Sequence, residues 1–131
     1  MSNKSIILRG FNNLIFEFID DIISIFPENN DLRDVRIAFE FFKKANPTSI
    51  IKSWEFFVYQ PYKDVIESGD LSFFCDKDYK ADLSYMNNSD DIMRAIDRIR
   101  GPVKQMNSKN KETAMKYVKN LCTLSNLYIK L

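Results

Sequence analysis

The sequence predicts an all-α fold, a single-domain bundle of about five to six helices. Apolar residues recur at three- and four-residue steps over most of the chain, which is the spacing of one helix face. Only 3 glycines and 4 prolines occur, and most of the prolines fall between the periodic segments. A length of 131 residues suits one compact domain, so we expect residues 1–131 to form a single helical domain.

The first two periodic segments are separated by Pro27. Proline disfavours helical angles in the residue before it, so Pro27 ends the first segment. Asp31 is the predicted N-cap of the second helix. The first stripe comprises Phe11, Leu14, Ile15, Phe18, Ile19, Ile22, Ile23 and Phe26, and the second comprises Val35, Ala38, Phe39 and Phe42.

A third helix is predicted from Asn46-Pro47, with the asparagine as N-cap and the proline at the first helical position. Pro61 allows a short fourth helix that ends near Ser68, with Gly69 as C-cap. The apolar residues of the third helix are Ile50, Ile51, Trp54, Phe57 and Val58.

Residues 70–88 lack helical periodicity and are expected to form an irregular acidic loop, with a short strand at 71–75 as the alternative. The run that starts at Asp76 has alternating carboxylates, as in a calcium loop. It has Ala81 where such a loop needs glycine and Asn87 where it needs glutamate. We therefore expect no metal site here.

Two further helices are expected in the last third of the chain. Ser89 or Asp90 caps the fifth helix, and Gly101-Pro102 breaks or kinks it. The last helix follows Ser108. The apolar residues of the fifth helix are Ile92, Ile96 and Ile99. In the last helix, the centre of one face is formed by Ala114, Val118, Leu121 and Ser125.

The chain has no histidine, which excludes Ser-His-Asp and Cys-His catalysis and imidazole ligation of a metal. Its few glycines leave no room for a glycine-rich phosphate loop. We expect a protein that is not an enzyme, with no catalytic residues, no cofactor, no metal and no small-molecule substrate.

Cysteine usage and the lack of a long apolar run point to an intracellular setting. Cys75 and Cys122 are too far apart for a CxxC motif, so we expect reduced thiols, with a disulfide between them as the alternative. No uncharged stretch has the length of a membrane span or a signal-peptide core. The expected location is cytoplasmic, without membrane contact.

The formal net charge of +1 is the balance of three unequal stretches. Residues 1–60 carry a net −1, residues 61–97 carry −5 and residues 98–131 carry +7. The basic end could bind nucleic acid or an acidic partner, or it could be a solvated face that neutralises the acidic middle. The candidate residues are Arg94, Arg98, Lys104, Lys116 and Lys119.

Several apolar residues fall outside the predicted core stripes. Ile37 and Phe41 point roughly away from the stripe of the second helix, and Phe56 and Tyr59 lie outside that of the third. A helix that is apolar on two sides is either central in the bundle or exposed at an interface. These four residues are the candidate contacts for a protein partner or for self-association.

Several short motifs spread along the chain carry a family resemblance: Phe11-Asn12-Asn13, Phe26-Pro27, Ala45-Asn46-Pro47, Trp54, Tyr62, Gly69-Asp70, Phe73-Phe74, Lys77-Asp78-Tyr79, Ile96-Asp97-Arg98-Ile99-Arg100 and Ala114-Met115-Lys116-Tyr117. Together they resemble a family of small helical proteins of large nucleocytoplasmic DNA viruses. The resemblance would span about residues 6 to 128 and implies a host-cytoplasmic or virion setting. It implies no functional residues, because no activity is established for that family.

Two functions therefore stand as hypotheses. The first is a non-enzymatic helical interaction or structural protein, viral in origin, which acts through its packing surfaces. The alternative is a nucleic-acid-binding accessory protein that uses the basic C-terminal third.

Overall fold

The computed structural model describes residues 3–68 and 90–131, which form a single bundle of helices without a strand. The all-α prediction is confirmed for these residues. The predicted loop at 70–88, its alternative strand at 71–75 and the caps at Gly69 and Ser89 lie outside them. The elements are α1 (Asn3–Ile25), α2 (Asn30–Ala45), α3 (Ser49–Trp54), the π-helix η1 (Glu55–Tyr59), the 3-10 helix η2 (Gln60–Tyr62), α4 (Lys63–Ser68), α7 (Asp90–Lys104) and α8 (Ser108–Lys130).

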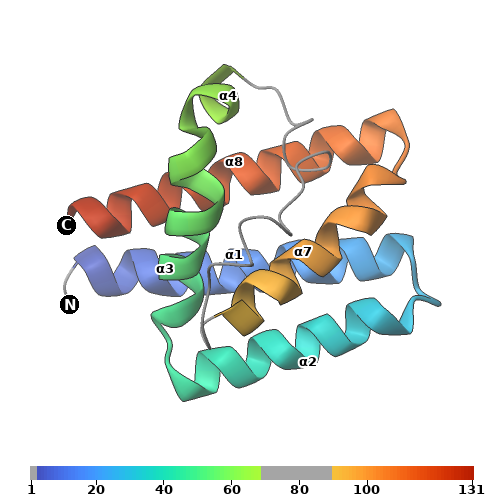
Figure 1. Cartoon of the computed structure of the whole chain (residues 1–131), viewed down its shortest axis with the longest axis horizontal. Helices are drawn as coiled ribbons and strands as arrows, with labels where there is room; N and C mark the ends of the chain where they lie inside the picture. The colour runs from blue at the N-terminus through green and yellow to red at the C-terminus, as the bar shows by residue number, and fades with distance from the viewer. Residues whose placement is uncertain (1–2, 69–89) are drawn as a thin grey trace.

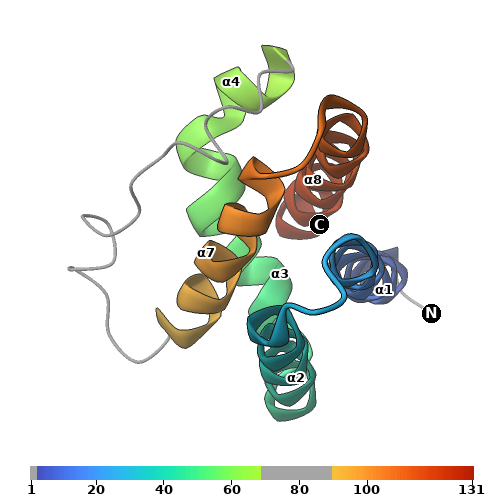
Figure 2. The ribbon, with the colours of Figure 1, turned by 90° about the vertical axis from the view of Figure 1, so that its right-hand side faces the viewer.

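The helices form two layers (Figures 1 and 2). In one layer α1, α2 and α8 run along the long axis, and α1 lies antiparallel to both of its neighbours (Figure 1). In the other layer α7 and the stretch from α3 to α4 cross them on one side (Figure 2). The first and last helices thus pack side by side.

The core fills the space between these layers, and most residues of the predicted apolar stripes are buried in it. The tryptophan ring of Trp54 lies edge-on to Phe11, with 6.3 Å between ring centroids. Phe18 stacks on Tyr117 across α1 and α8 at 5.2 Å. The fully buried large side chains include Phe11, Ile15, Phe18, Ile19, Ile22, Leu32, Phe39, Ile50, Ile51 and Trp54.

Helix α1 begins at Asn3, well before the periodic stripe that starts at Phe11. Ile7 and Leu8 of this additional stretch pack against the core. Gly10 lies exposed within the helix, and nothing lies within 4 Å of where its Cβ would be. The apolar residues before Arg9 are therefore the first turns of α1.

The predicted N-cap Asp31 is wrong, because Asn29 caps α2. Asn29 has extended backbone angles, and its side chain accepts a hydrogen bond from the Leu32 backbone N–H at 3.3 Å. Asp31 lies in the first turn, where a carboxylate is favoured by the helix dipole.

The starts of α3 and α8 also differ from the prediction by one or two residues. The Asn46 side chain accepts hydrogen bonds from the backbone N–H and the hydroxyl of Thr48, which forms a turn before the helix begins at Ser49. Asn107 rather than Ser108 caps α8, and its side chain accepts from the Asn110 N–H at 2.8 Å.

The short fourth helix predicted to end near Ser68 is confirmed as α4, but Pro61 does not interrupt the helical structure that leads into it. The chain stays helical from Ser49 to Ser68 through η1 and η2. The Gln60 N–H donates to the Glu55 carbonyl, five residues back, which marks the wide π turn. Because a π turn widens the helix, the proline ring is accommodated in the turn that follows.

Gly101-Pro102 does not break α7 either. The helix continues through Pro102 to Lys104, and the Gln105 N–H donates to the Gly101 carbonyl at 3.3 Å. Pro102 leaves the Arg98 carbonyl without its usual helical donor, which is tolerated because the helix ends within one turn.

Candidate functional site

Two of the predicted contact residues, Ile37 and Phe41, lie on the solvent side of α2. Their side chains are 63% and 68% exposed. Leu32, Val35 and Phe39 on the opposite side of the same helix are fully buried. Helix α2 therefore has a core face and, one turn apart, two large apolar side chains that the described residues leave uncovered.

The other two predicted contact residues, Phe56 and Tyr59, lie on η1. Phe56 is 54% exposed, whereas Tyr59 is half-buried against the core. The Tyr59 hydroxyl donates to Glu67 Oε1 at 3.4 Å, and burial, followed by the nearby Glu67 carboxylate, raises the pKa of Tyr59. Helix η1 packs against α3 and α8, whereas α2 packs against α1, α3 and α7. The two contact residues on η1 therefore have other neighbouring helices than the two on α2.

Two of the predicted basic residues, Arg94 and Arg98, form intramolecular ion pairs. Arg94 Nη1 lies 2.9 Å from Asp91 Oδ1, one turn away on α7. Arg98 reaches across to Asp31 on α2, and its hydrogen bond to that carboxylate raises the pKa of Arg98. The charge of Arg98 is therefore neutralised by a carboxylate from the first third of the chain.

The remaining predicted cations, Lys104, Lys116 and Lys119, are exposed. Lys104 ends α7, whereas Lys116 and Lys119 lie on α8. The five basic residues are thus divided between two helices. Lys116 and Lys119 form no ion pair with a carboxylate among residues 3–68 and 90–131.

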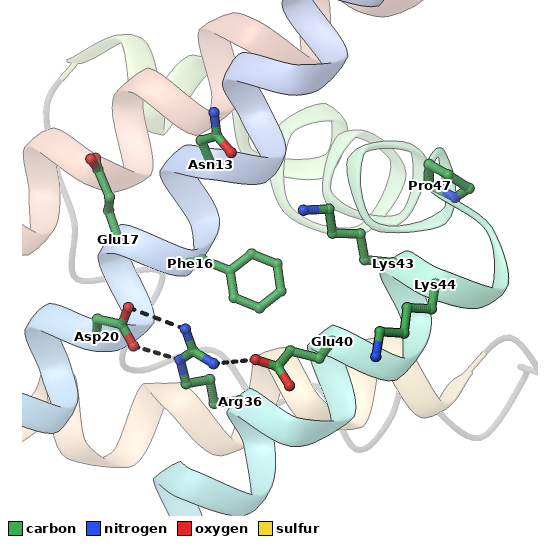
Figure 3. Close-up of a pocket in the computed structure, with 9 residues that line it drawn as sticks. All are labelled: Asn13, Phe16, Glu17, Asp20, Arg36, Glu40, Lys43, Lys44 and Pro47. Carbon is green, nitrogen blue, oxygen red and sulfur yellow. Dashed lines mark hydrogen bonds and ion pairs between the residues drawn. The ribbon is translucent and has the colours of Figure 1, made fainter.

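A groove between α1 and α2, with a volume of about 850 Å³, is the feature that sequence reasoning missed (Figure 3). Arg36 on α2 bridges it. Its Nε donates to Asp20 Oδ1 on α1 at 2.6 Å, and its Nη1 donates to Glu40. The hydrogen bond to Asp20 raises the pKa of Arg36. This three-residue network ties the two helices together at one end of the groove.

Phe16 projects into the middle of the groove (Figure 3). The Arg36 guanidinium lies 5.4 Å from the centroid of its ring, and the Lys43 ammonium lies 5.5 Å from it. Each cation–π contact at an exposed site contributes roughly 0.5–1 kcal/mol. The groove therefore combines a half-buried aromatic surface with charges of both signs.

A second missed feature is a buried polar cluster beside Trp54. Glu55, the first residue of η1, is fully buried, and its carboxylate accepts from Ser125 Oγ at 2.9 Å and from Gln60 Nε2 at 3.0 Å. The Trp54 indole N–H donates to Cys122 Sγ at 3.3 Å. Cys122 is a buried free thiol, whereas Cys75, its partner in the alternative of a disulfide, lies outside the described residues.

Replacing Ser125 by alanine is expected to lower the free energy of unfolding by about 1–3 kcal/mol, because it leaves a buried carboxylate oxygen of Glu55 without its donor. Urea denaturation followed by circular dichroism measures this change. Thr123→Ala is the matched control, since its exposed hydroxyl on the same helix contacts only the Lys119 carbonyl. Equal effects of the two substitutions would contradict the assigned role of Ser125.

Residues 3–68 and 90–131 contain neither a metal-binding cluster nor a membrane-spanning helix. No group of three or more histidine, cysteine, aspartate or glutamate side chains there could hold a metal ion. In the same part of the chain, no helix has the length and apolar character needed to span a membrane. The calcium-like run at 76–87 lies outside the described residues.

Comparison with known proteins gives no match to a family model, a curated protein or a solved structure. The resemblance to a family of DNA-virus proteins therefore stays a prediction.

Proposed function

We propose that the protein is a non-enzymatic helical interaction or structural protein that contacts a protein partner through the solvent face of α2. The observation that carries this proposal is the exposure of Ile37 and Phe41, at 63% and 68%. Burial of one such side chain in an interface removes apolar surface from water and contributes about 1.5–3 kcal/mol. A viral setting, which the family resemblance implies, forms part of the proposal.

The surroundings of these two residues support an interface. Arg33, Asp34 and Lys44 are exposed and lie three, four or seven residues from Ile37 or Phe41, so they fall beside them on the helix surface. An apolar centre with a polar rim is the usual composition of a protein–protein contact. Phe41 also packs edge-on to Phe42, with 6.4 Å between ring centroids, which restricts its ring.

The double substitution Ile37→Ser and Phe41→Ser is expected to abolish partner binding or self-association. It should change the free energy of unfolding by no more than about 0.5 kcal/mol, because neither side chain contributes to the core. Analytical ultracentrifugation reports self-association, and affinity capture from the native host with quantitative mass spectrometry reports partners.

Leu127→Ser is the matched control, because Leu127 is an exposed apolar residue on α8 rather than α2. The control is expected to behave as the unmodified protein in both measurements. If the double variant retains the same partners and the same oligomeric state as the unmodified protein, the proposal is wrong.

A further inference from the structure

The groove between α1 and α2 adjoins the solvent face of α2. Glu40 lies three residues after Ile37, and Lys44 lies three residues after Phe41. Residues three apart on a helix are neighbours on its surface, so a partner on Ile37 and Phe41 reaches the groove without leaving α2. The two features form one continuous surface.

The charges in the groove are unevenly neutralised. Arg36 is held by both Asp20 and Glu40. Lys43 contacts the Phe16 ring, but neither it nor Lys44 is paired with a carboxylate in the part of the chain that the structure describes. These two lysines therefore keep their capacity to bind an anionic group.

The groove is also polarised along its length. Lys43 and Lys44 lie near the end marked by Pro47, whereas Glu17 and Asp20 lie toward the other end (Figure 3). Glu17, like the two lysines, has no ion-pair partner within residues 3–68 and 90–131. A complementary ligand must therefore carry a negative group at one end and a positive group at the other.

We infer that this groove binds a short peptide segment of the protein partner, with a carboxylate toward Lys43 and Lys44, an apolar or aromatic side chain on Phe16, and a cation toward Glu17. This inference rests on the proposed function, because the same partner would cover Ile37 and Phe41. The Phe16 ring lies in the middle of the groove, so the apolar or aromatic residue of the segment stands between its acidic and basic residues.

The carboxylates of the groove favour a peptide over a nucleic acid strand. Glu17, Asp20 and Glu40 all line it. A nucleic acid presents negative phosphates at every step, so it would place some of them beside these carboxylates. A peptide can alternate the sign of its charges and match both ends.

The test is selection of short random peptides displayed on phage against the full chain, followed by affinity measurement with the synthesised peptides. We expect the selected sequences to share an acidic and a basic residue with an apolar or aromatic residue between them. The double variant Lys43→Glu and Lys44→Glu should bind them about tenfold or more weakly. Peptides with the acidic residue replaced by lysine should regain affinity for this variant.

The matched control is the double variant Lys116→Glu and Lys119→Glu, which reverses two exposed charges on α8. It is expected to bind the selected peptides as the unmodified protein does. Circular dichroism of both variants checks that each is folded.

Three results would overturn the inference, and they separate it from the proposed function. If the double variant Ile37→Ser and Phe41→Ser weakens peptide binding but Lys43→Glu and Lys44→Glu does not, the groove is not the binding site. The proposed function then stands. If a single-stranded oligothymidylate binds and competes with the peptides at Lys43 and Lys44, the ligand is a nucleic acid. If no peptide is selected, the groove inference fails, and partner capture with the α2 variants decides the proposed function on its own.

Discussion

Replacing Trp54 by alanine is expected to lower the free energy of unfolding by about 3–5 kcal/mol. Trp54 is fully buried, and its ring contacts Phe11 of α1 while its N–H donates to Cys122 of α8. The substitution therefore leaves a cavity where three helices meet. Since domains of this size are typically stable by about 5–15 kcal/mol, the variant would lose a large share of its stability.

Urea denaturation followed by circular dichroism tests this expectation. Trp54→Phe keeps an aromatic ring near Phe11 but removes the N–H donor. This variant should therefore lose less free energy of unfolding than Trp54→Ala. Phe56→Ala is the matched control, because Phe56 is an exposed aromatic residue of the same helical stretch and its removal should cost less than about 0.5 kcal/mol. Similar losses for Trp54→Ala and Phe56→Ala would refute the assignment of Trp54 to the centre of the core.

Raising the pH from 9 to 12 is expected to destabilise the protein through Cys122. Burial raises the pKa of its thiol from the ordinary value of 9.0 to about 12, while the hydrogen bond from Trp54 opposes the shift. Below pH 9 the thiol is protonated in both the folded and the unfolded protein, so its contribution to the free energy of unfolding is fully present. Between pH 9 and 12 the unfolded thiol ionises but the folded one does not, so stability falls by about 1.4 kcal/mol per pH unit.

The measurement is the free energy of unfolding against pH for the unmodified protein and for Cys122→Ala. Tyr59 and Tyr117 also have pKa values raised by burial, so both proteins should lose stability in alkali for that reason. The difference between the two curves isolates the thiol and should reach about 4 kcal/mol at pH 12. Parallel curves would show that Cys122 does not titrate differently in the folded and unfolded states.

The helices that carry the core were predictable because their apolar residues follow the helical repeat. The apolar stripes predicted for α1 and α8 are the buried faces of these helices. Ser125 lies on the stripe of α8, and a serine at such a position indicated a buried polar contact. Caps were less predictable because several capping residues stand together, as in Asn29-Asn30-Asp31. The unbroken helical stretch through Pro61 was not predictable, because the π turn before it depends on how η1 packs against α8.

The exposed positions of Ile37 and Phe41 followed from the same helical repeat, whereas the groove did not. The groove depends on which residues of α1 meet which residues of α2. Asp20 and Arg36 are separated by a turn and lie on different helices, so their contact is set by how α1 and α2 pack. Likewise, Glu55 gives no sign in the sequence that Ser125 of α8 will cover it.

The pairing of α1 with α8 has a consequence for synthesis on the ribosome. The chain emerges from its N-terminal end, so α1 is made long before α8, yet Phe18 stacks on Tyr117 and Lys4 lies over the Tyr128 ring at 4.7 Å. Until α8 has emerged, the face of α1 that it covers stays open to water and to other chains. The contacts between α1 and α8 can therefore form only after α8 has been synthesised and has emerged.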